Sequence, residues 1–191
     1  PPSLFRIEYP AKGDPALAEE MGNLLTLAGF NAEIDRQRGL DHGVWVPMMF
    51  IFPEADVPVI QLSLQTEENP DHHFRIGKAL RKLRDQGVLI IGSGGAVHNL
   101  DEVYQYKMND RPPDYVSTFD SWLNRMITLG DKDALLDYHK QSPEPEKCHP
   151  FPAEHLLPLF VCLGAADEPA GKMIHHGFLF GTLGMAAYEW H

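Results

Sequence analysis

Short apolar runs alternate with longer amphipathic stretches along the chain. Residues 88–91 are apolar and rich in β-branched side chains, as in a buried strand, and they lead into a Gly-Ser-Gly-Gly turn at residues 92–95. These small residues let one backbone approach another closely before a single histidine, His98, follows. Open α/β sheets bind ligands just beyond the carboxyl ends of their strands, so we expect His98 at such an edge. A turn followed by a core histidine fits this segment equally well.

The amphipathic stretches predict helices with clear boundaries. Residues 15–27 carry leucines and a methionine at helical spacing, with Asp14 to cap the helix, Pro15 in its first turn and Gly29 to end it. Further helices are expected at residues 71–86, 117–130 and 131–140, and from Pro152 into the apolar run 156–163. Strand candidates lie at residues 5–9, 30–34, 57–64, 88–91 and 177–188.

Strand, helix and strand follow one another between residues 57 and 91 at the spacing of a βαβ unit. We therefore predict an α/β fold, a central mixed β-sheet flanked by helices, as a single domain. The 191 residues, 43% of them hydrophobic, are enough to bury a full core.

The net charge of −11 argues against a nucleic acid or an anionic membrane surface as a partner and favours a small uncharged or amphoteric ligand. No apolar stretch reaches membrane-spanning length and no leader is evident, so we expect a cytoplasmic protein. The two cysteines, Cys148 and Cys162, are too few for a disulfide framework and are expected as reduced thiols.

Ten histidines are the stronger chemical signal, because histidine is the commonest metal ligand. Besides His98, two stand out. His42 follows Asp41, which could raise its basicity or orient it on a tight turn. Glu154 and His155 are expected in the first turn of a buried helix, where a charged or ligating pair needs a metal or a paired partner. A capping glutamate beside a core histidine is the alternative.

The remaining histidines carry weaker expectations. His72 and His73 are adjacent in the first turn of a predicted helix, point about 100° apart and are expected to be solvated. His175 and His176 fit either a pocket wall or a polar loop.

Six blocks, in order along nearly the whole chain, resemble the class III extradiol ring-cleavage dioxygenases, in the branch of the 4,5-DOPA dioxygenases. The blocks are YPAKGDP (9–15), GLDHGVW (39–45), PEADVPVIQLS (53–63), LRDQGVL (83–89), GSGGAVHNL (92–100) and EHLLPL (154–159). The resemblance implies a non-heme Fe(II) enzyme that opens a catechol ring with O2 to a ring-opened semialdehyde.

The same resemblance assigns roles to four residues. His155 matches a metal ligand, and His98 matches a histidine at the metal's edge, described either as a further ligand or as the acid/base that accepts a catechol proton. His42 matches a second catalytic histidine that hydrogen-bonds substrate or dioxygen. Glu154 is a possible metal ligand or a neighbour of the ligand.

One departure from the family pattern concerns the metal. The family's first two ligands are histidines of an N-terminal region, which by this alignment would precede Pro1. Two imidazoles cannot alone form a three-ligand site with open positions for catechol and O2. We therefore expect residues 1–191 to be an N-terminally incomplete dioxygenase domain, or else a relative without iron.

Two other functions stay open: a zinc-binding, hydrolase-like protein and a non-catalytic member of the same superfamily. Zinc is also a possible occupant of the site in the purified dioxygenase. The sequence leaves the choice of catechol and the oligomeric state undecided.

Overall fold

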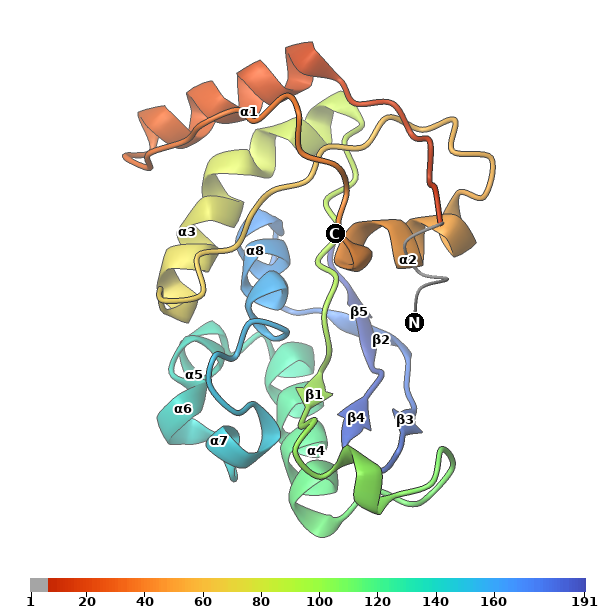
Figure 1. The fold of residues 1–191 in the computed structure, drawn as a ribbon. Helices are drawn as coiled ribbons and strands as arrows, with labels where there is room; N and C mark the ends of the chain where they lie inside the picture. The colour runs from red at the N-terminus through yellow and green to blue at the C-terminus, as the bar shows by residue number, and fades with distance from the viewer. Residues whose placement is uncertain (1–6) are drawn as a thin grey trace. The chain divides into compact units, whose positions relative to one another are not determined.

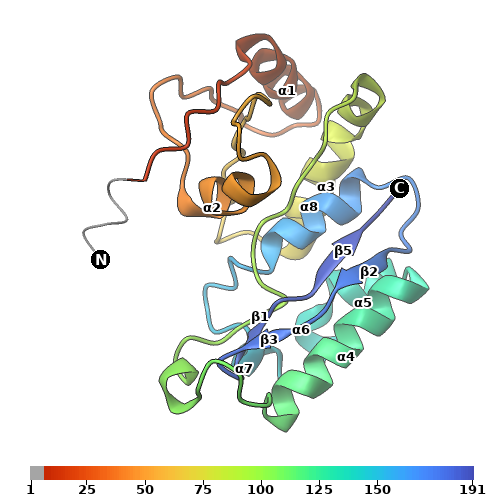
Figure 2. The same cartoon turned by 90° about the vertical axis from the view of Figure 1, so that its right-hand side faces the viewer.

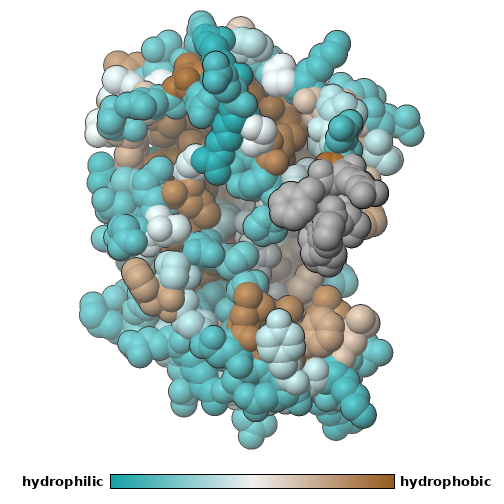
Figure 3. Space-filling view, viewed as in Figure 1, coloured by the Kyte–Doolittle hydropathy of each residue, from teal (hydrophilic) through white to brown (hydrophobic). Residues whose placement is uncertain are grey.

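A computed structural model describes residues 7–191, and the contacts along the chain divide it into two compact units, Pro1–Ser63 and Leu64–His191. We describe each unit by itself. No helix of the described residues is long and apolar enough to cross a membrane. The face of the molecule in Figure 3 is largely hydrophilic, with apolar side chains in small separate groups.

The first unit contains two helices. Helix α1 spans Pro15–Leu27, and the carboxylate of Asp14 accepts hydrogen bonds from two amides of its first turn, as the sequence predicts. Gly29 follows the helix with φ of 88°, a conformation that favours glycine. Helix α2 spans His42–Ile51 and contains Pro47. Neither 30–34 nor 57–63 forms a strand, nor do residues 7–9, and residues 5 and 6 of that candidate lie outside the described residues.

In the second unit two helices pack closely together, as both ribbon views show (Figures 1 and 2). Helix α3 (Pro70–Leu80) continues into the 3-10 helix η2 (Arg81–Gln86), and its partner α8 spans Leu157–Ala165. Glycines allow the approach: a Cβ on Gly77 would lie 2.0 Å from the carbonyl oxygen of Val161, and one on Gly164 would lie 2.0 Å from that of Phe74.

Helix α4 (Asp114–Leu129) lies along the strands of the second unit (Figure 2) and ends at Gly130 in the left-handed conformation. Three short helices, α5 (Lys132–Leu136), α6 (Tyr138–Gln141) and α7 (Pro145–Cys148), follow it, and the 3-10 helix η3 (Val103–Gln105) precedes it. The buried core is built mainly from these helices, α8 and the first strand. Its largest side chains are Tyr138, Phe119, Phe160, Leu123, Ile127, Leu135 and Leu156.

The strands form two small antiparallel sheets. In the first, β1 (Val97–His98) pairs with β4 (Leu183–Gly184), which pairs in turn with β3 (Phe178–Leu179). In the second, β2 (Lys172–His175) pairs with β5 (Ala187–Glu189). The α/β class is confirmed, and the prediction of strands after residue 177 is confirmed for β3, β4 and β5. All strand pairs of the described residues are antiparallel, so the βαβ unit expected between residues 57 and 91 does not form.

The strand predicted at residues 88–91 is the main difference. This segment runs as an extended ribbon in Figure 1, but it has no ladder partner within residues 7–191, and the side chain of Leu89 is 70% exposed. An apolar run becomes a strand only where another strand accepts its hydrogen bonds. His98 is therefore the last residue of the short strand β1 and does not follow a strand at residues 88–91.

The helix expected from Pro152 also begins later than predicted. Helix α8 starts at Leu157, with Pro158 in its first turn, so Glu154 and His155 lie in the turn before the helix. Pro158 fits the first turn because proline lacks the amide hydrogen that such positions leave unpaired.

Candidate metal and catalytic site

The fold brings two of the predicted site residues into contact. The imidazole rings of His98 and His155 stack with their centroids 3.6 Å apart and an angle of 18° between their planes. His98 comes from β1 and His155 from the turn before α8, so residues 57 positions apart in the sequence meet in the second unit. Both side chains are partly exposed, which leaves them accessible to a ligand.

The glycine-rich turn before β1 sets this contact. The amide of Gly95 donates a 2.9 Å hydrogen bond to the carbonyl oxygen of His155. A Cβ on Gly94 would lie only 2.0 Å from the same oxygen, and one on Gly92 would lie 2.6 Å from the carbonyl oxygen of Pro158. The structure thus confirms that small residues at 92–95 allow a close backbone approach, here to His155 and the start of α8.

The electrostatics around His98 favour its neutral form. Burial, and then the neighbouring ring of His155, lower the pKa of His98 below its ordinary value. A neutral imidazole has a lone pair available either for a metal ion or for a proton. The stacked pair is therefore suited to either of the two roles that the sequence left open for His98.

Glu154 stands beside this pair without joining it closely. One carboxylate oxygen, Oε1, lies 3.6 Å from Nε2 of His155, and the Glu154 side chain is 44% exposed. The capping role considered for Glu154 is wrong, because the N-cap of α8 is Leu156 and no side chain caps that helix. Glu154 remains a neighbour of the imidazole pair.

The pair supplies two ligands of the kind that a catalytic Fe(II) or zinc site uses. Within residues 7–191 no group of three or more His, Cys, Asp or Glu side chains is placed to hold a metal ion. The residues present therefore fit part of a metal centre, two imidazoles with a nearby carboxylate.

His42 belongs to the first unit, where it is exposed at the first position of α2 rather than on a tight turn. Asp41, the residue before His42, has a hydrogen-bond partner elsewhere in the first unit. Its carboxylate accepts a 2.6 Å hydrogen bond from the side-chain amide of Gln61, whose oxygen accepts a 2.9 Å bond from the Asp41 amide. Asp41 thus holds Gln61, 20 residues away.

Three other histidines, His73, His149 and His176, have specific partners. His149 is 3% exposed and its Nε2 lies 2.9 Å from the carbonyl oxygen of Ala96. His73 is fully buried, against expectation, with Nδ1 3.0 Å from the carbonyl oxygen of Asn69. In the sequence, its burial is indicated only by its position on the apolar face of the predicted helix. His176 contacts the buried carboxylate of Asp120 at 2.9 Å.

The cysteines behave as predicted. Both are free thiols, and burial raises the pKa of Cys148 to about 12 and that of Cys162 to about 11. Neither is therefore a free thiolate near neutral pH.

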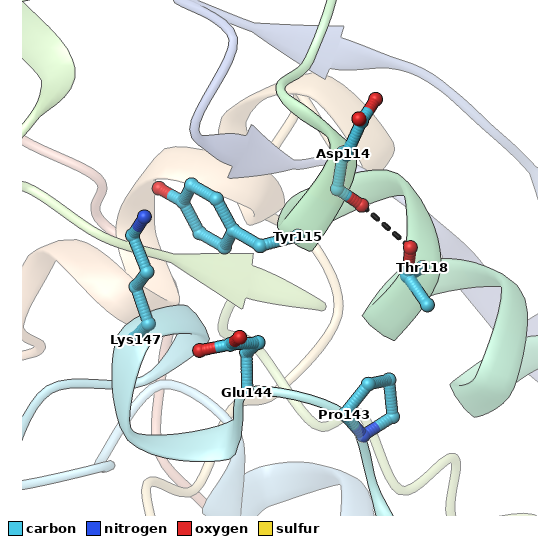
Figure 4. Close-up of a pocket in the computed structure, with 6 residues that line it drawn as sticks. All are labelled: Asp114, Tyr115, Thr118, Pro143, Glu144 and Lys147. Atoms are coloured by element: carbon cyan, nitrogen blue, oxygen red, sulfur yellow. Dashed lines mark hydrogen bonds between the residues drawn. The ribbon is translucent and has the colours of Figure 1, made fainter.

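A surface cavity of about 480 Å³ is lined by none of the four predicted site residues, and Figure 4 shows the side chains that do line it. The ammonium group of Lys147 lies 4.0 Å from the centre of the Tyr115 ring on one side of this cavity. The lining residues are Asp114, Tyr115, Thr118, Pro143, Glu144 and Lys147. Its relation to the imidazole pair is indirect, because Tyr115 and Lys147 both contact Asn99, the residue after His98.

Comparison with known proteins adds an independent line of argument. A family model described as the catalytic LigB subunit of aromatic ring-opening dioxygenase matches residues 2–190. A 4,5-DOPA dioxygenase extradiol from Portulaca grandiflora is 42% identical over 192 residues, which cover 99% of this chain and 70% of the relative.

Two proteins from Escherichia coli are also similar. A 4,5-DOPA dioxygenase extradiol from strain K12 is 32% identical over 99% of this chain and 70% of its own length. The crystal structure of an uncharacterized protein from K12 superposes with a TM-score of 0.83 at 31% identity, covering 95% of this chain and 75% of the other.

Proposed function

Because the chain belongs to the family of the catalytic LigB subunit of aromatic ring-opening dioxygenases, we propose that the protein opens the ring of a DOPA-like catechol with O2. As a member of this family it is an extradiol aromatic ring-opening dioxygenase. The proposal adds the substrate class, Fe(II) as the cofactor and a ring-opened semialdehyde as the product. It treats residues 1–191 as belonging to one dioxygenase domain, in keeping with a single family match over residues 2–190.

The observation that carries the site assignment is the contact between His98 and His155, whose ring centroids are 3.6 Å apart. We assign both imidazoles as ligands of the metal ion. The alternative for His98 is the acid/base role, which the experiment below separates from ligation. Glu154, 3.6 Å from His155, is assigned as a neighbour that orients this ligand. His42 is assigned as a second catalytic residue, on the family resemblance alone.

The bound metal would supply Lewis acidity, which stabilises the oxyanions of a catechol at neutral pH. The protein residues supply the rest. His98 enters the site as a neutral base, because burial and repulsion from His155 disfavour a proton on its ring. The Gly95 amide holds the backbone of His155, so the second imidazole is positioned before any ligand arrives. His42 would donate a hydrogen bond through its imidazole to the substrate or to dioxygen.

The test is an anaerobic reconstitution of the complete protein with Fe(II), followed by O2 and a panel of catechols that includes DOPA and caffeate. We expect a yellow ring-opened product from at least one catechol, with product formation dependent on Fe(II). No product from any catechol by an iron-loaded protein would refute the enzymatic proposal. Zinc-dependent hydrolysis without any ring cleavage would favour the hydrolase-like alternative.

Variants test the individual assignments. We expect His155→Ala and His98→Ala to lose iron and activity together, and His42→Ala to keep its iron while turnover falls by about 100-fold or more. His72→Ala, in the first turn of α3, is the control and is expected to change neither. An iron-loaded but inactive His98→Ala protein would contradict the ligand assignment and make His98 the acid/base.

A further inference from the structure

Two buried polar side chains outside the imidazole pair bind the segments that carry it. We propose that His149 and Asn99 are positioning residues, which clasp β1 to the segment leading into His155 and so fix the separation of the two imidazoles. This inference rests on the proposed function of the pair. Neither residue is a candidate ligand itself, because both are 3% exposed and both use their polar atoms on other partners.

His149 forms the first half of the clasp. Its Nε2 lies 2.9 Å from the carbonyl oxygen of Ala96, two residues before His98. A carbonyl oxygen only accepts, so Nε2 must carry the hydrogen. The ring packs against Phe119 of α4, with centroids 5.4 Å apart, and burial lowers the pKa of His149 to about 4. The imidazole is therefore a neutral, fixed donor near neutral pH.

Asn99 forms the second half, on the other side of His98. Its side-chain amide donates a 2.8 Å hydrogen bond to the carbonyl oxygen of Lys147 and a 3.3 Å bond to the hydroxyl of Tyr115. Its side-chain oxygen accepts a 2.9 Å bond from the amide of Asp101. Both ends of the Asn99 side chain are thus occupied, as a buried amide requires.

The hydrogen bonds of His149 and Asn99 join the same two segments on either side of His98. Ala96 and Asn99 flank His98 on one segment, and their partners His149 and Lys147 precede His155 on the other. The bond from Gly95 to His155 completes the set. His98 therefore sits between two anchored points, and the backbone of His155 is held at a third. Loss of one anchor would let the imidazoles separate without unfolding the domain.

A buried histidine could instead serve only to fill the core, and the chain offers a matched control for that case. His73 is also buried, and its ring also contacts a backbone carbonyl, that of Asn69, at 3.0 Å. It lies at the opposite end of α8 from His155, because the carbonyl of its neighbour Phe74 approaches Gly164. Replacing His73 should cost stability in the same way without touching the imidazole pair.

The experiment compares three variants with the wild type. His149→Phe keeps an aromatic ring but removes the donor, His149→Gln keeps a side-chain N–H donor, and His73→Phe is the control. Co²⁺ affinity is measured by calorimetry and by the visible spectrum of the bound ion. The ring resonances of His98 and His155 are recorded by NMR in the metal-free protein. Fe(II)-loaded enzyme is assayed for kcat and KM separately.

We expect His149→Phe to bind Co²⁺ about 10- to 100-fold more weakly and to shift both ring resonances, the usual cost of losing a residue that orients a ligand. His149→Gln should recover most of the affinity, and His73→Phe should stay within about 2-fold of the wild type at a similar loss of stability. In the enzyme, kcat should fall more than KM rises.

Wild-type Co²⁺ affinity and unshifted resonances in His149→Phe would overturn the inference, as would an equal loss in His73→Phe. If His149→Phe does not fold, Asn99→Asp replaces it, because the carboxylate cannot donate to Lys147; wild-type affinity there would also overturn the clasp. If the wild type binds no Co²⁺, the proposed function fails. The resonance shifts in metal-free protein then still decide whether the clasp exists.

Discussion

Gly94→Ala perturbs the candidate site at the point where two backbones are closest. The added Cβ would lie 2.0 Å from the carbonyl oxygen of His155, whereas ordinary contacts begin at 3.4 Å. One of the two backbones must therefore move by about 1.4 Å, the difference between these distances. No flexible side chain can absorb the shift, because the obstructing atom belongs to the backbone. One of the two backbones belongs to His155 and the other leads from Gly94 into His98, so either movement displaces one of the two imidazoles.

Two effects of different size should follow. Overpacking of this kind typically costs about 1–3 kcal/mol of stability. A misplacement of about 1 Å in a catalytic group costs on the order of 100-fold in rate, so metal binding and activity should suffer more than folding. The neighbouring Gly95→Ala is the matched control, since its Cβ would meet the carbonyl oxygen of Val97 at 3.3 Å and Cβ of His98 at 3.5 Å.

The assay combines urea denaturation with Co²⁺ titration of Gly94→Ala and Gly95→Ala. We expect Gly94→Ala to remain folded, with a lowered unfolding midpoint and Co²⁺ affinity reduced by at least about 10-fold. Gly95→Ala should retain most of the affinity. Equal affinities in Gly94→Ala and the wild type would refute the view that close backbone packing sets the imidazole pair.

Two further predictions concern stability. The pKa of His149 is lowered from 6.5 to about 4 in the folded state, so the unfolded chain binds a proton between these values while the folded chain does not. The stabilisation that the neutral His149 ring contributes to the free energy of unfolding is therefore complete above pH 6.5. It is lost as the pH falls toward 4, by up to about 3 kcal/mol. Urea unfolding midpoints measured between pH 7.5 and about 4.5 report this loss. If the midpoint of His149→Phe falls as steeply with decreasing pH as that of the wild type, the loss does not come from His149. His176→Ala should leave the Asp120 carboxylate, 4% exposed, without its 2.9 Å partner and cost about 1–3 kcal/mol. Adding Asp120→Asn to that variant should restore part of the loss in the same assay, and no recovery would mean that His176 acts by packing.

Local signals in the sequence predicted most of the longer helices, but not α2 at His42–Ile51. Asp14, Gly29, Gly87 and Gly130 act at the helix ends where capping and left-handed conformations are needed. These signals depend on a few neighbouring residues, so they can be interpreted without knowing the rest of the fold. Helix α8 was placed too early because two prolines compete for its first turn, and Pro158 rather than Pro152 occupies it.

Strands were predicted less well, because a strand needs a partner that its own residues do not specify. Residues 88–91 have the composition of a strand and no ladder partner among the described residues, whereas the two-residue strand β1 pairs with β4, 86 positions along the chain.

In the candidate site too, residues with local signals were predicted and residues that act through distant contacts were not. His98 and His155 were marked by their neighbours, and the glycine turn that brings them together was also visible in the sequence. His149 and Asn99 were not marked, because their importance lies in hydrogen bonds to residues 53 and 48 positions away. Nothing near His73 indicated its burial except the helix face on which it lies.

The central claim is that His98 and His155 bind one metal ion. Crystals of the complete protein, soaked anaerobically with Fe(II), test it most directly through anomalous diffraction at the iron edge. We expect a single peak within bonding distance, about 2 Å, of one ring nitrogen of each imidazole. A fully loaded protein whose iron lies away from His98 and His155 would contradict it.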